Sequence, residues 1–192
     1  MPRITARDRI LSAAAHRFYS GGITATGIDA ITAEAGVAKQ SLYNNFASKS
    51  DLVSTYIDER HGEWLALHEA REAAASTPRE RVLAVFDAYL DHARGAADQA
   101  FRGCGLLNAA AEFPAGSPER AAVRRHKEEV EAILAAALDG AGDGTLTRAA
   151  ARELAGHLSL LLEGGVARAG LEGTTAQLER AKRLAEQLTA GV

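Results

Sequence analysis

The chain has 192 residues, a mass of 20.2 kDa and a formal net charge of −3 at pH 7. Apolar residues make up 47% and charged residues 24%, as in ordinary globular proteins, which excludes a disordered or collagen-like chain. Only 5% of the residues are aromatic, whereas 42 are alanine. Because alanine favours helices and disfavours strands, the composition predicts an all-α protein.

The chain holds a single cysteine, Cys104, which excludes an internal disulfide and a cysteine-rich zinc site. The longest strongly apolar run, Leu158 to Leu162, is far too short to span a membrane. The N-terminus lacks the apolar segment of a secretion signal. We therefore expect a cytoplasmic protein.

The charge is divided unevenly along the chain. Residues 1–50 carry a net charge of +3, so the remaining residues carry −6. A basic head on an acidic body is typical of a nucleic-acid-binding module with a separate second function. Taken alone this is weak support, because charged runs are usually solvated surface.

The basic head predicts three helices. Apolar residues at helical spacing predict the first from Arg7 to Ser20. Thr26 is expected to cap the second, with Asp29 as its capping-box partner, and Gly36 to end it. A short third helix is expected from Ala38 to Asn45.

Six further helices are predicted in the body, with no strand and no internal repeat. Ser48 is expected to cap the first of them, with Asp51 as its reciprocal partner, and Pro78 to stand in the first turn of the next. The expected spans are Ser48 to about Ala75, from Pro78 past Leu90, Leu106 to Phe113, Ser117 to Leu138, Thr145 or Thr147 to about Gly170, and from Thr174 or Thr175 past Leu188.

The second and third helices, joined by Gly36, have the spacing of a helix-turn-helix motif. Glycine at the turn allows a positive φ without a Cβ clash. The third helix is polar around the single apolar anchor Leu42, so packing alone would stabilise it poorly. Its residue types suit DNA, because Gln and Asn bond adenine, Lys bonds guanine, and hydroxyls bond phosphate.

The segment from Phe18 to Leu52 resembles the DNA-binding domain of the TetR/AcrR family of bacterial regulators. Asn45 and Thr32 depart from the family pattern, which often has His or Tyr at the first position and Ala at the second. The residues that carry the resemblance are Phe18, Gly22, Thr26, Ile28, Ile31, Ala35-Gly36-Val37, Ser41-Leu42-Tyr43, Phe46, Lys49 and Leu52.

The resemblance implies an N-terminal DNA-binding domain of three helices, residues 1–50, and an effector-binding and dimerisation domain, residues 51–192. The implied base contacts are Lys39, Gln40 and Asn44. The implied phosphate contacts are Thr26, Ser41, Tyr43 and Lys49, and Asn45 belongs to the same surface. Helix N-termini favour anions at Thr26 and Lys49, although Thr26 could be only a cap and Tyr43 a core aromatic.

One three-helix DNA-binding domain contacts only one half-site of an operator, so we expect a homodimer that binds a palindromic operator. The resemblance places the last two helices in the interface, although an intramolecular core would use the same residues. The expected interface residues are Leu154, Leu158, Leu161, Leu162, Val166, Leu178, Ala181, Ala185 and Leu188.

The middle helices of the body are expected to enclose a pocket for a small-molecule effector. The few polar groups among its large side chains suit a largely apolar effector. The expected lining residues are His61, Trp64, His68, Phe86, Tyr89, Phe101, Cys104, Leu107, Asn108, Phe113 and His126.

Together these features predict a ligand-responsive repressor that a small effector releases from its operator. The chain shows no nucleophile elbow, phosphate-binding loop or dinucleotide motif, so we expect no enzyme and no cofactor. We expect no metal, since His61 and His68 lack a third ligand at suitable spacing, and Cys104 is more typical of a small buried residue than of a redox sensor. The alternative is a ligand-independent DNA-binding protein that acts in chromosome organisation.

Overall fold

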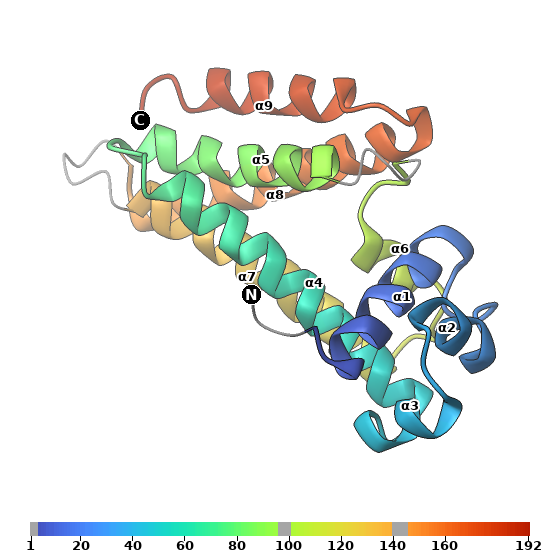
Figure 1. Ribbon diagram of the computed structural model, residues 1–192. Helices are drawn as coiled ribbons and strands as arrows, with labels where there is room; N and C mark the ends of the chain where they lie inside the picture. Colours follow the sequence, from blue (N-terminus) through green and yellow to red (C-terminus); the bar gives the residue numbers. More distant parts are fainter. Residues whose placement is uncertain (1–3, 96–100, 140–145) are drawn as a thin grey trace. The chain divides into compact units, whose positions relative to one another are not determined.

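The computed structural model describes residues 4–95, 101–139 and 146–192. Within these ranges every regular element is an α-helix, as the composition predicts (Figure 1). The helices are α1 (Ala6–Gly21), α2 (Ile28–Ala35), α3 (Lys39–Asn45), α4 (Lys49–Glu72), α5 (Pro78–Gly95), α6 (Gly105–Ala111), α7 (Pro118–Asp139), α8 (Arg148–Glu172) and α9 (Ala176–Leu188). None of these helices is long and apolar enough to cross a membrane.

The chain folds into two compact units. Unit 1 comprises residues 1–61 and 105–123, and unit 2 comprises residues 62–104 and 124–192. Helices α1, α2, α3 and α6 belong to unit 1, α5, α8 and α9 belong to unit 2, and α4 and α7 contribute residues to both. The packing therefore adds a second stretch of chain to the head, while the expected functional boundary after residue 50 stays a prediction.

The predicted cap of α2 by Thr26 is wrong. Gly27 is the N-cap residue of α2, and no side chain caps it. The Thr26 hydroxyl donates instead to the carbonyl oxygen of Gly22 at 2.6 Å, since that acceptor lies in the preceding turn. The other end of α2 is as predicted, because Gly36 has a φ of 63° in the left-handed region.

Other helix starts follow their local sequence signals. Ser48 precedes α4, and its hydroxyl accepts the amide of Asp51 at 3.1 Å. The Asp51 carboxylate accepts the amide of Ala47, one residue earlier than predicted, at 2.9 Å. Thr147 caps α8, whereas the alternative cap Thr145 lies outside the described residues.

The start of α9 is only partly as predicted. Thr175 is its N-cap residue, but no side-chain bond caps the helix. The Thr175 hydroxyl donates to the carboxylate of Glu179 at 3.0 Å, and the Thr175 carbonyl oxygen accepts the backbone amide of Glu179 at 2.9 Å.

Unit 1 has its own apolar core, which anchors the helix-turn-helix on α1 and α4. Phe18 of α1 meets Tyr56 of α4 edge to face, with ring centroids 5.4 Å apart. Helix α3 contributes a single fully buried side chain, Leu42, as predicted. Other buried residues of this core are Ile10, Ile31, Phe46 and Leu52.

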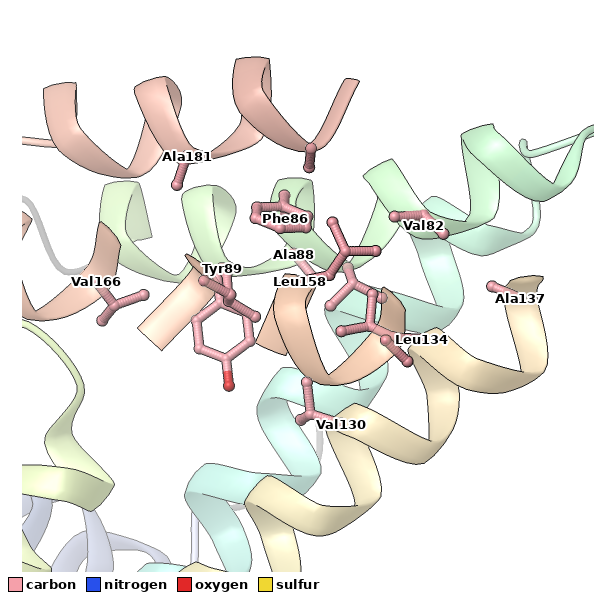
Figure 2. Close-up of a cluster of buried hydrophobic side chains, with 14 of the residues drawn as sticks. Val82, Phe86, Ala88, Tyr89, Val130, Leu134, Ala137, Leu158, Val166 and Ala181 are labelled. Carbon is pink, nitrogen blue, oxygen red and sulfur yellow. The ribbon is translucent and has the colours of Figure 1, made fainter. Parts of the chain in front are cut away.

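Unit 2 has a larger core, formed between α5, α7, α8 and α9 (Figure 2). Helix α9 packs against both α5 and α8. At Gly165 a Cβ atom would lie 2.7 Å from the Cβ of Ala181, so α8 and α9 approach closely there. Fully buried side chains of this core include Val82, Phe86, Leu134, Leu158, Leu162 and Leu178.

Candidate nucleic-acid interface

Helix α3 presents a polar face to solvent. Leu42 is its one fully buried residue, and Ser41 is half-buried. The exposed residues of the helix are Lys39, Gln40, Tyr43, Asn44 and Asn45, all of them expected DNA contacts. A seven-residue helix with one anchor and five exposed polar or amphipathic side chains is suited to a partner rich in hydrogen-bonding groups.

In the free protein these side chains bond to near neighbours. The Gln40 side-chain amide donates to the Asn44 carbonyl oxygen at 3.1 Å, which places both on one face of the helix. Lys39 pairs with Asp29 of α2 at 2.8 Å, and this hydrogen bond raises the pKa of Lys39. Such exposed bonds are weak in water, so base edges and phosphates could replace them at small cost.

The two expected phosphate contacts outside α3 bond to backbone within unit 1. Thr26 is only 6% exposed, and its hydroxyl donates to carbonyl oxygens of Gly22 and Arg17. Lys49 is half-buried, and its ammonium donates to the Ile23 carbonyl oxygen at 2.6 Å. Since an ammonium has three donors and a hydroxyl one, Lys49 keeps capacity for a phosphate and Thr26 does not.

Basic residues of α1 hold the helix-turn-helix together rather than extending the polar face. Arg17 and His16 both bond to the carboxylate of Glu34 in α2, the latter at 2.6 Å. Although partial burial opposes ionisation, these two bonds lower the pKa of Glu34. Arg9 donates to the carbonyl oxygen of Gly36 at 3.4 Å. The sequence shows which residues of α1 are basic, but it contains no signal for the residues they bond to, which lie 17 to 27 positions away.

The residues expected around an effector divide between the two units. In unit 2, the Trp64 ring lies 5.4 Å from that of His68, 5.2 Å from Tyr89 and 5.7 Å from His126, between centroids. Phe86 is buried in the core of the same unit, and Phe101 and Cys104 pack partly buried against it. Those in unit 1 are His61, Leu107, Asn108 and Phe113.

A partly buried ion pair beside this aromatic cluster has no counterpart in the sequence prediction. Lys127 of α7 is 17% exposed, and its ammonium lies 2.7 Å from a carboxylate oxygen of Glu163 in α8. It also donates to the Tyr89 hydroxyl at 3.1 Å and to the Cys104 sulfur at 3.5 Å. Burial opposes its charge, but Cys104, Tyr89 and Glu163 raise the pKa of Lys127. These partners are far apart in sequence, so no local motif could have indicated them.

Buried polar atoms without a hydrogen-bond partner in the described part of unit 2 include Nε1 of Trp64, Nε2 of His68 and Oε2 of Glu163. Burial lowers the pKa of His68, so its ring is neutral at pH 7. The Trp64 nitrogen can therefore donate to a bound molecule and the Glu163 oxygen can accept from one, while the role of the His68 nitrogen depends on its tautomer. No described group of three His, Cys, Asp or Glu residues is placed to hold a metal ion.

The residues expected in a dimer interface lie mostly inside the single chain. Leu154 and Leu161 pack half-buried against the core of unit 2, and only Leu188 of the nine is exposed. Those at most 3% exposed are Leu158, Leu162, Val166, Leu178, Ala181 and Ala185. These six form the intramolecular core that helical periodicity could not separate from an interface, while the homodimer itself stays a prediction.

Comparisons with known proteins agree with this architecture. The sequence model described as "Bacterial regulatory proteins, tetR family" matches residues 10–55, and "Tetracyclin repressor-like, C-terminal domain" matches residues 78–185. The HTH-type transcriptional activator FasR of Mycolicibacterium smegmatis is 36% identical over 93 residues, which span 47% of this chain and 42% of that protein.

Solved structures extend the likeness to nearly the whole chain. A TetR-family transcriptional regulator from Streptomyces coelicolor is 31% identical with a TM-score of 0.85, covering 97% of this chain and 95% of that one. The regulatory protein TetR from Rhodobacter sphaeroides shares the fold at 24% identity and a TM-score of 0.80, covering 95% of this chain and 98% of that one. The chain belongs to the TetR family of transcriptional regulators, which are not enzymes, and its helix-turn-helix is their DNA-binding domain.

Proposed function

We propose that the protein binds a palindromic operator as a homodimer in the cytoplasm and represses transcription until a small, largely apolar effector releases it. The observation that carries this proposal is the pairing in one chain of an exposed polar α3 with a separate unit holding unpartnered buried polar atoms. The first suits DNA, and the second suits a small molecule.

The DNA contacts rest on the exposed face of α3. Gln40 and Asn44 bond to each other across one helical turn, so they would contact neighbouring base edges, and Lys39 lies on the same short helix. Tyr43, Ser41 and Lys49 would bind phosphates. Thr26 contributes through the backbone turn that it stabilises, because its hydroxyl is already donated.

The homodimer is supported by an exposed apolar stripe on α8. Leu160 and Leu171 are 74% and 88% exposed, and exposed Gly164 and Ala167 lie between them on the same helical face. Leu188 on α9 is 53% exposed. A second copy that covered this stripe with its own would bury apolar surface that a single chain leaves in water.

The chemistry of unit 2 narrows the effector class. Lys127 and Glu163 neutralise each other, and burial lowers the pKa of His68, so neither the ion pair nor His68 favours an ionic ligand. Trp64 offers an N–H donor and Glu163 a free acceptor oxygen. An uncharged, largely apolar molecule with a hydroxyl or amide group suits such atoms, since that group donates and accepts.

One comparison favours a second candidate for the direction of control. FasR is described as an activator, so the same architecture in this chain could serve activation of its target genes. The two candidates differ in whether the operator-bound protein lowers or raises transcription of its target genes.

The test is selection of duplexes from a random-sequence pool with the purified full chain, followed by fluorescence anisotropy on the selected DNA. We expect one palindrome, with affinity falling about 10³–10⁵-fold between 50 and 200 mM salt. Gln40→Ala should weaken operator binding by about 1–3 kcal/mol through one base step. The matched control Gln187→Ala, at an exposed position of α9, should bind as the wild type does. Equal affinity for all sequences would contradict the proposal and favour chromosome organisation.

The selected operator then serves to screen uncharged amphipathic compounds. A compound that lowers operator affinity supports effector release, and in vitro transcription from a promoter that carries the operator, with and without the protein, separates repression from activation. By reciprocity the operator must change the affinity for that compound by the same factor. Unequal factors would contradict a single coupled effector site.

A further inference from the structure

Glu112, which directly follows α6, bonds to the turn between α1 and α2. One carboxylate oxygen accepts the backbone amide of Ile23 at 2.8 Å, and the other accepts that of Thr24 at 2.7 Å. These residues are almost 90 positions away in sequence, yet all belong to unit 1. No helix-turn-helix motif in the first 55 residues contains Glu112, and the sequence prediction assigned it no role.

The turn is shaped to receive this carboxylate. Gly22 has a φ of 89°, and a Cβ atom there would lie 3.0 Å from an oxygen of Glu112. Although burial opposes its charge, the amide bonds from Thr24 and Ile23 lower the pKa of Glu112, so it is ionised at neutral pH. Glycine in the turn thus leaves room for a charged acceptor at two backbone donors.

Lys49 bonds to the same turn and strengthens the arrangement. Its ammonium donates to the carbonyl oxygen of Ile23 at 2.6 Å, and its charge also stabilises the Glu112 carboxylate. Ile23 is therefore held through its N–H by one charged side chain and through its carbonyl by another. This fixes the backbone that leads directly into Gly27 and α2.

We propose that Glu112 is a positioning residue for DNA binding, whose carboxylate fixes the α1–α2 turn and with it the orientation of α2 and α3 for the operator. The inference rests on the proposed operator binding. The apolar core of unit 1 does not depend on Glu112, which lies at the surface, so its loss should leave the protein folded.

Loss of the Glu112 charge and loss of its hydrogen bonds should change operator affinity in opposite directions, so the direction of the measured change decides between them. Removing a negative charge from the DNA-binding unit should by itself strengthen binding to phosphates. Loss of the two amide bonds should instead weaken operator binding, because α2 and α3 would no longer be held in one orientation. A merely structural role would lower the melting temperature without changing the affinity of the folded protein.

The experiment compares wild type, Glu112→Ala, Glu112→Gln and the control Glu128→Gln, which removes an exposed carboxylate from unit 2. Operator affinity is measured on the selected duplex at a temperature where circular dichroism shows each variant folded. Amide hydrogen exchange of Ile23 and Thr24 is measured by NMR in parallel. We expect about tenfold weaker binding for Glu112→Ala, equivalent to about 1.4 kcal/mol, with faster exchange of both amides.

Glu112→Gln keeps one acceptor oxygen and should lie between wild type and Glu112→Ala, while Glu128→Gln should match the wild type. If Glu112→Ala does not fold, the operator affinities and amide exchange of Glu112→Gln and Glu128→Gln are compared to test the inference. Wild-type affinity or tighter binding in the Glu112 variants, or unchanged exchange of both amides, would overturn the inference alone. A wild-type protein that selects no DNA would contradict the proposed function and this inference with it.

Discussion

Lys127 joins three helices of unit 2 at one partly buried point. It belongs to α7, pairs with Glu163 of α8 and donates to the Tyr89 hydroxyl of α5, whose ring extends away from α9 (Figure 2). Charges taken out of water are stable only with such partners. Because the other oxygen of Glu163 already lacks a partner, loss of the ammonium would leave the whole carboxylate poorly satisfied.

We therefore expect Lys127→Ala to lower the free energy of unfolding by about 1.5–3 kcal/mol, the range for hydrogen bonds to charged groups. The control is Arg124→Ala, which removes a cation from the same helix but breaks only an exposed pair with Glu128. That change should cost about 0.5 kcal/mol or less. Urea unfolding followed by circular dichroism measures both, and equal losses would contradict the role given to Lys127.

At the scale of elements, α8 carries two adjacent glycines, of which only Gly165 packs against α9. A Cβ atom at Gly165 would lie 2.7 Å from the Cβ of Ala181, whereas one at Gly164 would meet nothing within 4 Å. The two positions lie in the same helix, so an alanine gains the same helix propensity at each. Any difference in stability between the two substitutions therefore reports the contact with α9.

Gly165→Ala should destabilise the protein by about 1–3 kcal/mol, as overpacking of a core does. Because Gly164 lies in the stripe proposed for the dimer, both variants are made in the Leu160→Glu background, where Gly164→Ala should stabilise the protein by about 0.5–1 kcal/mol, the gain of alanine over glycine within a helix. Thermal unfolding of both variants at one protein concentration gives the comparison. A Gly165→Ala protein as stable as Gly164→Ala would show that α9 can move away without loss.

Local signals explain which elements the sequence could predict. Gly36 and Ser48 act on residues within one turn, so the helix ends that they determine could be recognised from sequence. Thr26 failed as a cap because α2 begins one residue later, with Gly27 as its N-cap residue. The hydrogen bonds from the α1–α2 turn to Glu112 and the ion pair of Lys127 with Glu163 depend on tertiary packing alone, and no rule of sequence spacing predicts them.

At the scale of the whole molecule, helical periodicity identifies apolar faces but not what covers them. Leu158 and Leu162 recur at helical spacing, as the residues of a dimer interface would, yet both are buried within the single chain. Leu160 stands between them and faces solvent. The apolar side chains of α8 that stay exposed in the single chain thus lie on the opposite side of the helix from those that the sequence pattern favoured.

Leu160→Glu should convert the expected dimer into a folded monomer, because an unpaired charge in an apolar interface costs several kcal/mol. Sedimentation equilibrium measures the mass, and circular dichroism checks the fold. Ala136→Glu places the same charge on an exposed position of α7 and should leave the dimer intact. A Leu160→Glu protein that sediments like the wild type would move the interface away from α8.

Unit 1 is built from two separate segments of the chain, so the DNA-binding head cannot be transferred to another protein as one continuous segment. A chimera that grafted only residues 1–61 onto another regulator would leave the amides of Ile23 and Thr24 facing a foreign loop. It would also lose Gly105, whose lack of a side chain admits the ring of Tyr19 and the hydroxyl of Tyr56. We therefore expect that moving the operator specificity of this chain to another regulator requires residues 105–123 together with residues 1–61, although unit 2 lies on both sides of residues 105–123 in the chain.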